Sequence, residues 1–176
     1  MTRPTPILTT ARLGLREMTA DDLDFVAAML ADPEVMRFYP KCYSRTEAAQ
    51  WLERQIQRYA THGHGLWLAV DTQSGEPVGQ TGLVLQHVDG VDETEVGYLV
   101  HRPFWRRGYA TEAALAIRDH AFAVRDRPRV ISLIRPENLP SQGVARKLGM
   151  QPEKRTLHGG FEHLVFAASR PLPPQA

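Results

Sequence analysis

The sequence predicts an α/β domain built on a mixed β-sheet, and three observations lead to this class. Apolar or alternating strand-like runs interleave with amphipathic helical runs along the chain. Glycine-containing turn signals separate several consecutive strand runs, which predicts antiparallel hairpins. Strand–helix–strand segments lie between these hairpins and predict parallel crossovers. Together they predict the order β-α-α-β-β-β-α-β-α-β-β.

The first half of the chain predicts a strand, two helices and a three-stranded meander. Residues 13–17 alternate and predict the first strand. Thr19 is expected to cap the first helix, with Asp22 three residues later, and Ser44 with Glu47 forms a full capping box for the second helix. The strands of the meander are expected at Leu66–Val70, Pro77–Leu85 and Glu93–Val100, with turns at Ser74-Gly75 and Asp89-Gly90.

The second half predicts two helices that alternate with three strands. The first helix is expected from about Gly108 to Val124, and the second from Asn138 to Leu148, with Gly149 at its C-terminal cap. The apolar face of the first helix comprises Ala110, Ala114, Ile117, Ala121 and Val124. The strands are expected at Val130–Ile134, Gln151–Leu157 and Phe161–Ala168, the last two joined by the hairpin signal His158-Gly159-Gly160.

Size and composition limit the classes of protein that fit. The 176 residues suit one domain over 1–176, with a core at about 8–169 between proline-containing ends that we expect to be loose. A net charge of +1 argues against nucleic-acid binding by bulk charge, and no apolar run is long enough to span a membrane. The single cysteine, Cys42, fits a reducing compartment, so we expect a cytoplasmic protein. The seven histidines lack a metal-binding spacing, so no metal site is predicted.

A strand–loop–helix junction near residue 101 predicts an anion site. The strand-like run that ends at Val100 leads into His101, and Arg106-Arg107-Gly108 stands where the next helix should begin. The first N–H groups of a helix lack internal partners, glycine permits close approach of the backbone, and arginine binds phosphate oxygens. This pattern favours a phosphorylated cofactor, whereas the alternative interpretation is a solvated basic loop.

Five motifs occur in an order that resembles one enzyme family. They cover nearly the whole chain, and each is weak when taken alone. The motifs are Thr10-Ala-Arg-Leu-Gly-Leu-Arg16, Asp32 to Met36, Glu95 to Tyr98, Trp105 to Ala113, and Asn138 to Ser141 followed by Lys147 to Met150. This series resembles the GNAT superfamily of acetyl-CoA-dependent N-acetyltransferases, and within it the branch that acetylates ribosomal-protein alanine.

The resemblance implies a cofactor site for acetyl-CoA and no metal. Its pyrophosphate would be held by Arg106, Arg107, Gly108, Tyr109, Ala110 and Thr111. Its pantetheine arm would run beside the strand end, within reach of the main chain of Leu99, Val100 and His101, and Asn138 would contact the arm or the reacting centre. Gly97, in the middle of that strand, is consistent with a bulge or a close approach there.

The reaction implied by the resemblance is acyl transfer from a thioester to an amine, which requires a base. Glu95 is the candidate base, with Glu93 as its substitute; the alternative is an exposed charge or an ion pair. Ser141 is the candidate acid by resemblance to the branch, and its alternative role is a cap in the first helical turn. A tyrosine that many relatives carry four residues before the glycine is here Ala145, so that helix supplies no tyrosine acid.

The acceptor is not defined by the sequence. The resemblance places it between the linker at residues 32–44 and the last hairpin at residues 156–161. The linker contains Asp32, Glu34, Phe38 and Tyr39, which suit a small amine or a protein N-terminus equally. A homodimer is compatible with the family. Two alternatives remain open: a non-catalytic acyl-CoA-binding or regulatory module on the same fold, and a nucleotide-binding protein that uses the arginine loop.

Overall fold

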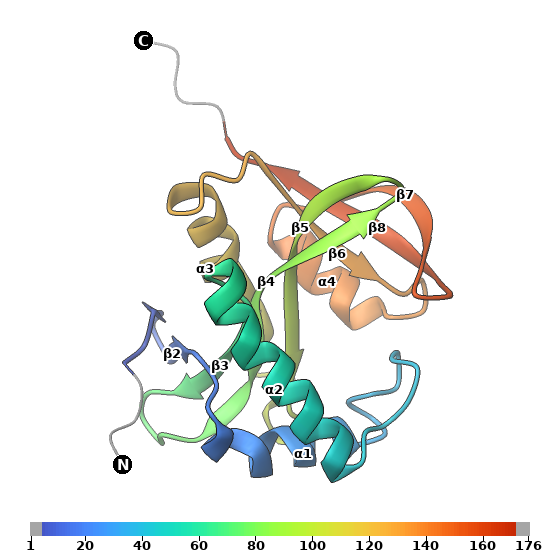
Figure 1. The fold of residues 1–176 in the computed structure, drawn as a ribbon. Coiled ribbons are helices and arrows are strands. Elements are labelled where there is room, and N and C mark those ends of the chain that lie inside the picture. Colours follow the sequence, from blue (N-terminus) through green and yellow to red (C-terminus); the bar gives the residue numbers. More distant parts are fainter. Residues whose placement is uncertain (1–4, 172–176) are drawn as a thin grey trace.

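A computed structural model, in which residues 5–171 are described, contains one mixed eight-stranded sheet in the order β1-β2-β3-β4-β5-β6-β8-β7 (Figure 1). The mixed α/β class is therefore confirmed. The strands are β1 (Leu8–Thr9), β2 (Leu13–Arg16), β3 (Leu66–Asp71), β4 (Pro77–Val88), β5 (Val91–Val100), β6 (Arg129–Ile134), β7 (Gln151–His158) and β8 (Phe161–Ser169). The helices are α1 (Leu23–Ala31), α2 (Arg45–His62), α3 (Tyr109–Ala123) and α4 (Leu139–Lys147), with short 3-10 helices at Ala20–Asp22 and Arg102–Phe104.

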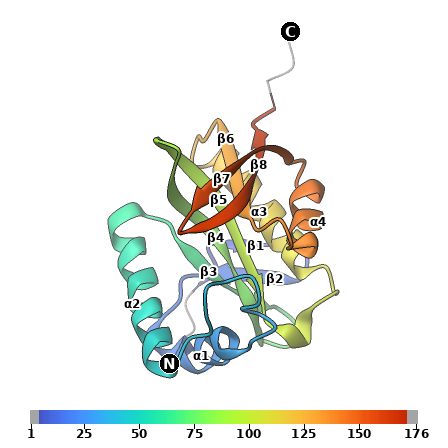
Figure 2. The ribbon, with the colours of Figure 1, turned by 90° about the vertical axis from the view of Figure 1, so that its right-hand side faces the viewer.

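Helices cover both faces of the sheet, with α1 and α2 on one face and α3 and α4 on the other (Figure 2). The alternation of side chains along β3 explains the arrangement. Trp67 and Ala69 join the core beneath α3, whereas Leu68 joins the core beneath α1 and α2. A strand that is apolar on both faces must be covered on both, which places β3 and its neighbours in the middle layer.

The chain turns where short-range signals predict. Ser44 caps α2, because its Oγ accepts from Glu47 N (3.3 Å) while the Glu47 carboxylate accepts from Ser44 N (2.8 Å). Gly63 ends α2 in the left-handed region, at φ 66°. Asp89 and Gly90, with φ of 49° and 84°, form the tight turn between β4 and β5.

Three features differ from expectation. The two-residue strand β1 pairs with β2, although its sequence is too short to show a period. Val124, expected on the buried face of α3, lies past the end of the helix and is 67% exposed. Pairing between β4 and β5 runs without a register shift, so Gly97 makes no bulge; a Cβ there would lie 3.1 Å from the end of the Leu66 side chain.

One end of the β4–β5 hairpin folds back over the last strands. At its turn, Asp89 accepts from Thr156 Oγ1 (2.6 Å) and pairs with Lys154 Nζ (2.7 Å), both on β7. A small apolar cluster that includes Val88, Ile131 and Val165 lies beneath this closure. The end of the β4–β5 hairpin therefore covers this apolar cluster, which α1 and α2 do not reach. Figure 1 shows β4 and β5 crossing β7 and β8 there.

Two buried histidines make stability depend on pH. His120 on α3 is 9% exposed, and within residues 5–171 neither ring nitrogen has a hydrogen-bond partner; its ring packs edge-on against Trp67, 5.4 Å between centroids. Burial first, then Arg125 and His64, lowers the pKa of His120. Burial also lowers the pKa of His64, despite the hydrogen bond between His64 Nδ1 and the Leu83 carbonyl.

We therefore expect acid to destabilise the fold. The unfolded chain binds protons at these histidines at a higher pH than the native fold does, so stability falls as pH drops below about 6.5, the ordinary pKa of histidine. Melting temperatures measured down to about pH 5 should show this fall, and His120→Leu should flatten it. An equally steep fall in the variant would show that the loss has another origin.

No helix among residues 5–171 combines the length and apolar character needed to cross a membrane.

Candidate functional site

The site lies where β5 and β6 separate. Among residues 5–171 they are the one parallel pair of strands, and only one pair of residues, Glu95 and Ile131, is in register between them. Beyond it, side chains connect the two strands: Glu95 Oε1 accepts from Leu133 N (3.1 Å), and Ser132 Oγ donates to the Val96 carbonyl (2.8 Å). The strands thus open into a gap bordered by polar groups.

Glu95 stands at the base of this gap. Its second oxygen, Oε2, accepts from Gln86 Nε2 on β4 at 2.7 Å, so both oxygens are oriented. Burial raises the pKa of Glu95, and the hydrogen bonds from Gln86 and Leu133 oppose that shift without cancelling it. A carboxylate with a raised pKa and free lone pairs on each oxygen can accept a proton from a reacting group near neutral pH.

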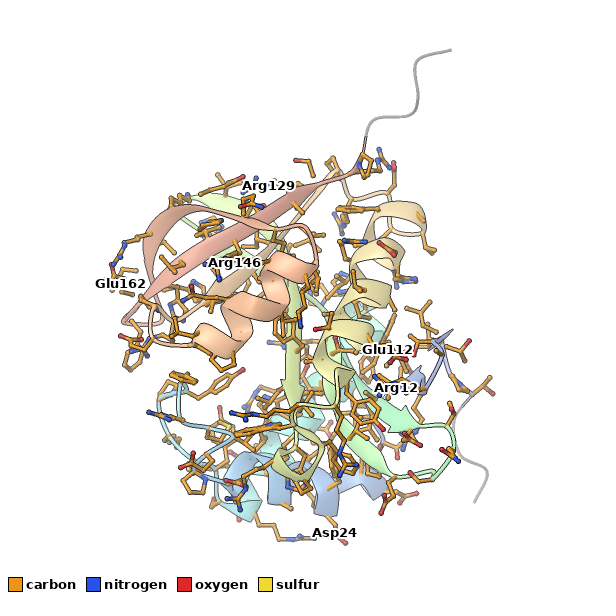
Figure 3. The ribbon with its side chains drawn as sticks, turned by 180° about the vertical axis from the view of Figure 1, so that it is seen from behind. Arg12, Asp24, Glu112, Arg129, Arg146 and Glu162 are labelled. Atoms are coloured by element: carbon orange, nitrogen blue, oxygen red, sulfur yellow. The ribbon has the colours of Figure 1, made fainter. Side chains whose placement is uncertain are left out.

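Glu93, the substitute base, lies in a different environment. Its carboxylate accepts from Arg129 Nε at 3.2 and 3.3 Å, and the same guanidinium binds Glu153 on β7. Figure 3 shows Arg129 at one end of the sheet, far from Glu112 at the start of α3. The carboxylate of Glu93 is held in an ion pair with Arg129. Of the two glutamates, the geometry therefore favours Glu95 as the base.

Two segments that are distant in sequence approach Glu95 from the face that carries α1 and α2. Tyr39 of the 32–44 linker keeps 47% of its surface exposed; partial burial, with the charge of Glu95 next, raises the pKa of Tyr39 to about 12. From β7, His158 acts electrostatically on Glu95 and lowers its pKa. The linker and the last hairpin thus each carry a side chain that interacts electrostatically with Glu95.

Tyr98 is a site residue that sequence reasoning missed. Its hydroxyl donates to the Ser141 carbonyl (2.9 Å) and accepts from Ser141 Oγ (3.1 Å), which joins β5 to α4 across the gap. Burial raises the pKa of Tyr98 although its hydrogen bond with Ser141 opposes the shift, and the charges of Glu95 and Tyr39 add to the rise, so the phenol stays protonated. The strand carries Tyr98 and the helix carries Ser141, 43 residues apart, so no local pattern could have paired them.

The cap of α4 is Asn138 and not Ser141. Asn138 Oδ1 accepts from Ser141 N at 3.1 Å, which leaves the Ser141 hydroxyl to Tyr98. The alternative role of Ser141 as the capping side chain is therefore wrong. Asn138 is half-buried, and its amide Nδ2 has no partner among residues 5–171, which leaves a donor at the edge of the gap.

Of the three residues whose main chain was expected at the open edge of β5, only Val100 lies there; the expectation for Leu99 and His101 is wrong, because their main chains face β4. His101 N donates to the Val78 carbonyl (2.9 Å) on β4, and the alternation of an antiparallel pair directs the main chain of Leu99 to β4 as well. The main chains of Tyr98 and Val100 face the other way, into the gap. The Val100 carbonyl accepts from Trp105 Nε1 (2.6 Å), which ties the following loop to the strand.

That loop ends in an anion cradle at the start of α3. Arg106 has φ 61° and Gly108 has φ 81°, both left-handed, which is unusual for arginine. The first helical bond runs from Glu112 N to the Gly108 carbonyl, and within residues 5–171 no acceptor engages the N–H groups of Gly108, Tyr109, Ala110 and Thr111. These N–H groups and the exposed Arg106 and Arg107 side chains can bind a phosphate group.

Comparison with known proteins identifies the family. A model of the acetyltransferase (GNAT) domain matches residues 12–151. The protein YkkB of Bacillus subtilis (strain 168), itself uncharacterised, is 34% identical over 148 residues, which are 84% of this chain and 86% of YkkB. The chain belongs to the GNAT acetyltransferase family. This protein is therefore an acetyltransferase, and the series of five motifs correctly predicted its family.

Solved structures agree with this GNAT assignment. An acetyltransferase from Agrobacterium tumefaciens strain C58 is 27% identical, with a TM-score of 0.81 and coverage of 97% of this chain and 96% of that one. RimL, an alpha-N-protein acetyltransferase for a ribosomal protein, in a complex with coenzyme A, has a TM-score of 0.76. At 16% identity, with coverage of 93% of this chain and 97% of RimL, it supports the fold alone.

Within residues 5–171, no three His, Cys, Asp or Glu side chains are grouped so that they could hold a metal ion.

Proposed function

We propose that this acetyltransferase moves the acetyl group of acetyl-CoA directly to a primary amine, with Glu95 as the general base. One observation carries the proposal: the oriented, half-buried carboxylate of Glu95 lies at the base of the gap between β5 and β6. The anion cradle of α3 begins a few residues after β5 ends, so a phosphorylated cofactor bound there can extend its arm along the open edge of β5.

The proposed reaction needs few groups. The amine nitrogen attacks the thioester carbonyl carbon, and its proton passes to Glu95, directly or through one water. Main-chain N–H groups at the open edge of β5 can stabilise the oxyanion of the tetrahedral intermediate. That intermediate then collapses, breaks the carbon–sulfur bond and releases the thiolate of CoA. The thiolate takes a proton from water, or from Ser141 Oγ once that hydroxyl turns away from Tyr98, and the serine then recovers its proton from water.

The acceptor is proposed to bind between the 32–44 linker and the last hairpin. Tyr39 of the linker and His158 of the hairpin each interact electrostatically with Glu95, and a carboxylate near aromatic side chains suits a cationic amine with an apolar body. Both small amines and peptide N-termini fit this chemistry, so both should be screened as acceptors.

Calorimetric titration with acetyl-CoA, run beside ATP and NAD, tests the proposal first. Binding of acetyl-CoA alone, followed by release of free thiol when amines are added, would support it. Binding of ATP or NAD instead would favour a nucleotide-binding protein. Binding of acetyl-CoA without transfer to any amine in a broad screen would favour a non-catalytic acyl-CoA module.

The hydroxyl pair Tyr98–Ser141 gives a further prediction. Tyr98→Phe removes the acceptor that orients Ser141 Oγ, so we expect kcat to fall about tenfold while the affinity for CoA changes little. Ser141→Ala should have a similar effect, and the double variant should be no worse than either, because the two residues act as one unit. A Tyr98→Phe enzyme as fast as the wild type would remove the pair from the mechanism.

A further inference from the structure

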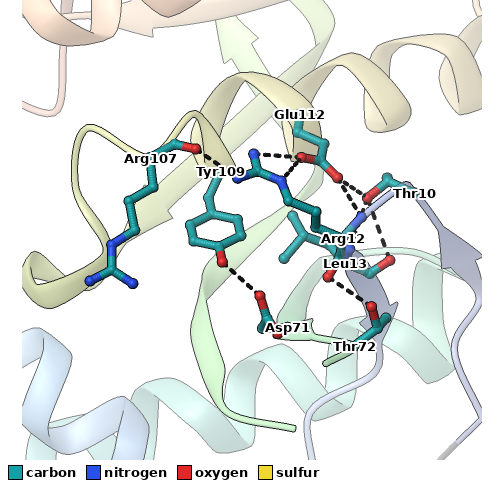
Figure 4. Close-up of polar contacts among 8 residues, drawn as sticks. All are labelled: Thr10, Arg12, Leu13, Asp71, Thr72, Arg107, Tyr109 and Glu112. Carbon is teal, nitrogen blue, oxygen red and sulfur yellow. Dashed lines mark hydrogen bonds and ion pairs between the residues drawn. The ribbon is translucent and has the colours of Figure 1, made fainter. Parts of the chain in front are cut away.

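Arg12, immediately before β2, is bound to the start of α3 by several contacts (Figure 4). Its Nε donates to Glu112 Oε2 (2.7 Å), and its Nη2 lies 2.7 Å from the same oxygen. Its Nη1 donates to the Arg107 carbonyl (2.9 Å), and its guanidinium lies over the Tyr109 ring, 4.5 Å from the centroid. One side chain thus contacts the loop, the first turn of α3 and the aromatic ring between them.

Glu112 explains why such a clamp is needed. It is the acidic residue in the first turn of α3, at the helix end whose N–H groups form the anion cradle. An unpaired carboxylate there would repel a phosphate group. Glu112 is instead turned to the β1–β2 segment, where Thr10 Oγ1 (2.6 Å) and Arg12 N (2.8 Å) also donate to Oε1. Figure 3 shows Arg12 and Glu112 side by side.

The contact with the Arg107 carbonyl has a second consequence. The carbonyl of Arg107 and the N–H of Gly108 belong to one planar trans peptide, so they point in opposite directions. Anchoring the carbonyl to Arg12 therefore directs the Gly108 N–H away from Arg12. Tyr109 keeps this arrangement in place, because its hydroxyl donates to Asp71 Oδ2 (2.6 Å) at the end of β3.

We infer that Arg12 is a positioning residue for the cofactor: it neutralises Glu112 and orients the Arg107–Gly108 peptide, so that the start of α3 accepts the phosphates of CoA. The inference rests on the proposed function. In this role Arg12 acts through Glu112 and the Arg107–Gly108 peptide, whereas Arg106 and Arg107 are proposed to bind the phosphates directly. The β1–β2 segment, far from the cradle in sequence, thereby becomes part of the cofactor site.

A double-mutant cycle with CoA as the probe tests this role by calorimetry. Arg12→Met should weaken CoA binding about tenfold at low ionic strength and less at high salt, because it leaves Glu112 unpaired beside the phosphates. In a Glu112→Gln background the same substitution should cost only a few-fold, since no charge remains to be neutralised. Arg118→Met is the matched control: Arg118, also on α3, pairs with Asp119 (2.6 Å) and donates to the Leu148 carbonyl (2.6 Å), remote from the cradle.

The outcomes are distinct. Wild-type affinity in Arg12→Met would overturn the inference. An equal loss in both backgrounds would overturn the role through Glu112, because the effect would then pass through the Arg107 carbonyl alone. If Arg12→Met does not fold, Arg12→Lys replaces it: the charge remains but the bidentate contact is lost, and an intermediate loss of CoA affinity is expected. A wild-type protein that does not bind CoA would instead overturn the proposed function, and with it this inference.

Discussion

Glu95→Gln is expected to lower kcat/KM for acetyl transfer by about 100-fold or more at neutral pH, the contribution typical of a general base. The substitution keeps the shape of the side chain. Its amide oxygen can still accept from Leu133 N, and the Gln86 amide can rotate to accept from the new NH2 group. A loss of rate with unchanged CoA affinity and melting temperature would then report the missing proton acceptor.

The pH profile gives this prediction a second readout. Burial raises the pKa of Glu95, and only the deprotonated form can act as a base. The wild-type rate should therefore fall as pH drops through a value above the ordinary carboxyl range, and this acid limb should disappear in Glu95→Gln. Glu93→Gln is the control, because Glu93 is paired with Arg129; its rate should stay within a few-fold of wild type. Equal turnover of Glu95→Gln and wild type between about pH 6 and pH 9 would show that Glu95 is not the base.

Arg106→Ala combined with Arg107→Ala is expected to weaken CoA binding about 100-fold at low ionic strength. Each arginine can add a charge-assisted hydrogen bond to a phosphate, and both side chains lie on the exposed loop before α3. The loss should shrink at high salt, because exposed charges are screened. Calorimetric titration at two salt concentrations measures both effects.

The helix start itself should retain weak binding in this double variant, since its N–H groups remain. Arg54→Ala, an exposed substitution on α2, controls for a general loss of positive charge. Unchanged CoA affinity of the double variant at low salt would exclude these arginines from phosphate recognition.

Short-range patterns account for what could be predicted. The capping box of Ser44 and the turn at Asp89-Gly90 each depend on a few consecutive residues, and each forms as expected. On the expected apolar face of α3, Ala114, Ile117 and Ala121 are buried as predicted, whereas Ala110 is only half-buried and Val124 lies exposed past the end of the helix. Strand β1 was missed because two residues carry no period, and only pairing with β2 defines it.

The mixed α/β class and the family could be read from the sequence alone, and so could the two segments proposed to carry the site, β5 and the start of α3. Motifs and periodicity involve residues that are close in the sequence, so they can be recognised without the structure. Only the tertiary structure decided which side chains meet: Glu95 with Leu133, Tyr98 with Ser141, and Arg12 with Glu112. These contacts join residues 38 to 100 positions apart, and their geometry depends on where β5 and β6 separate and how α3 packs, which no local pattern encodes.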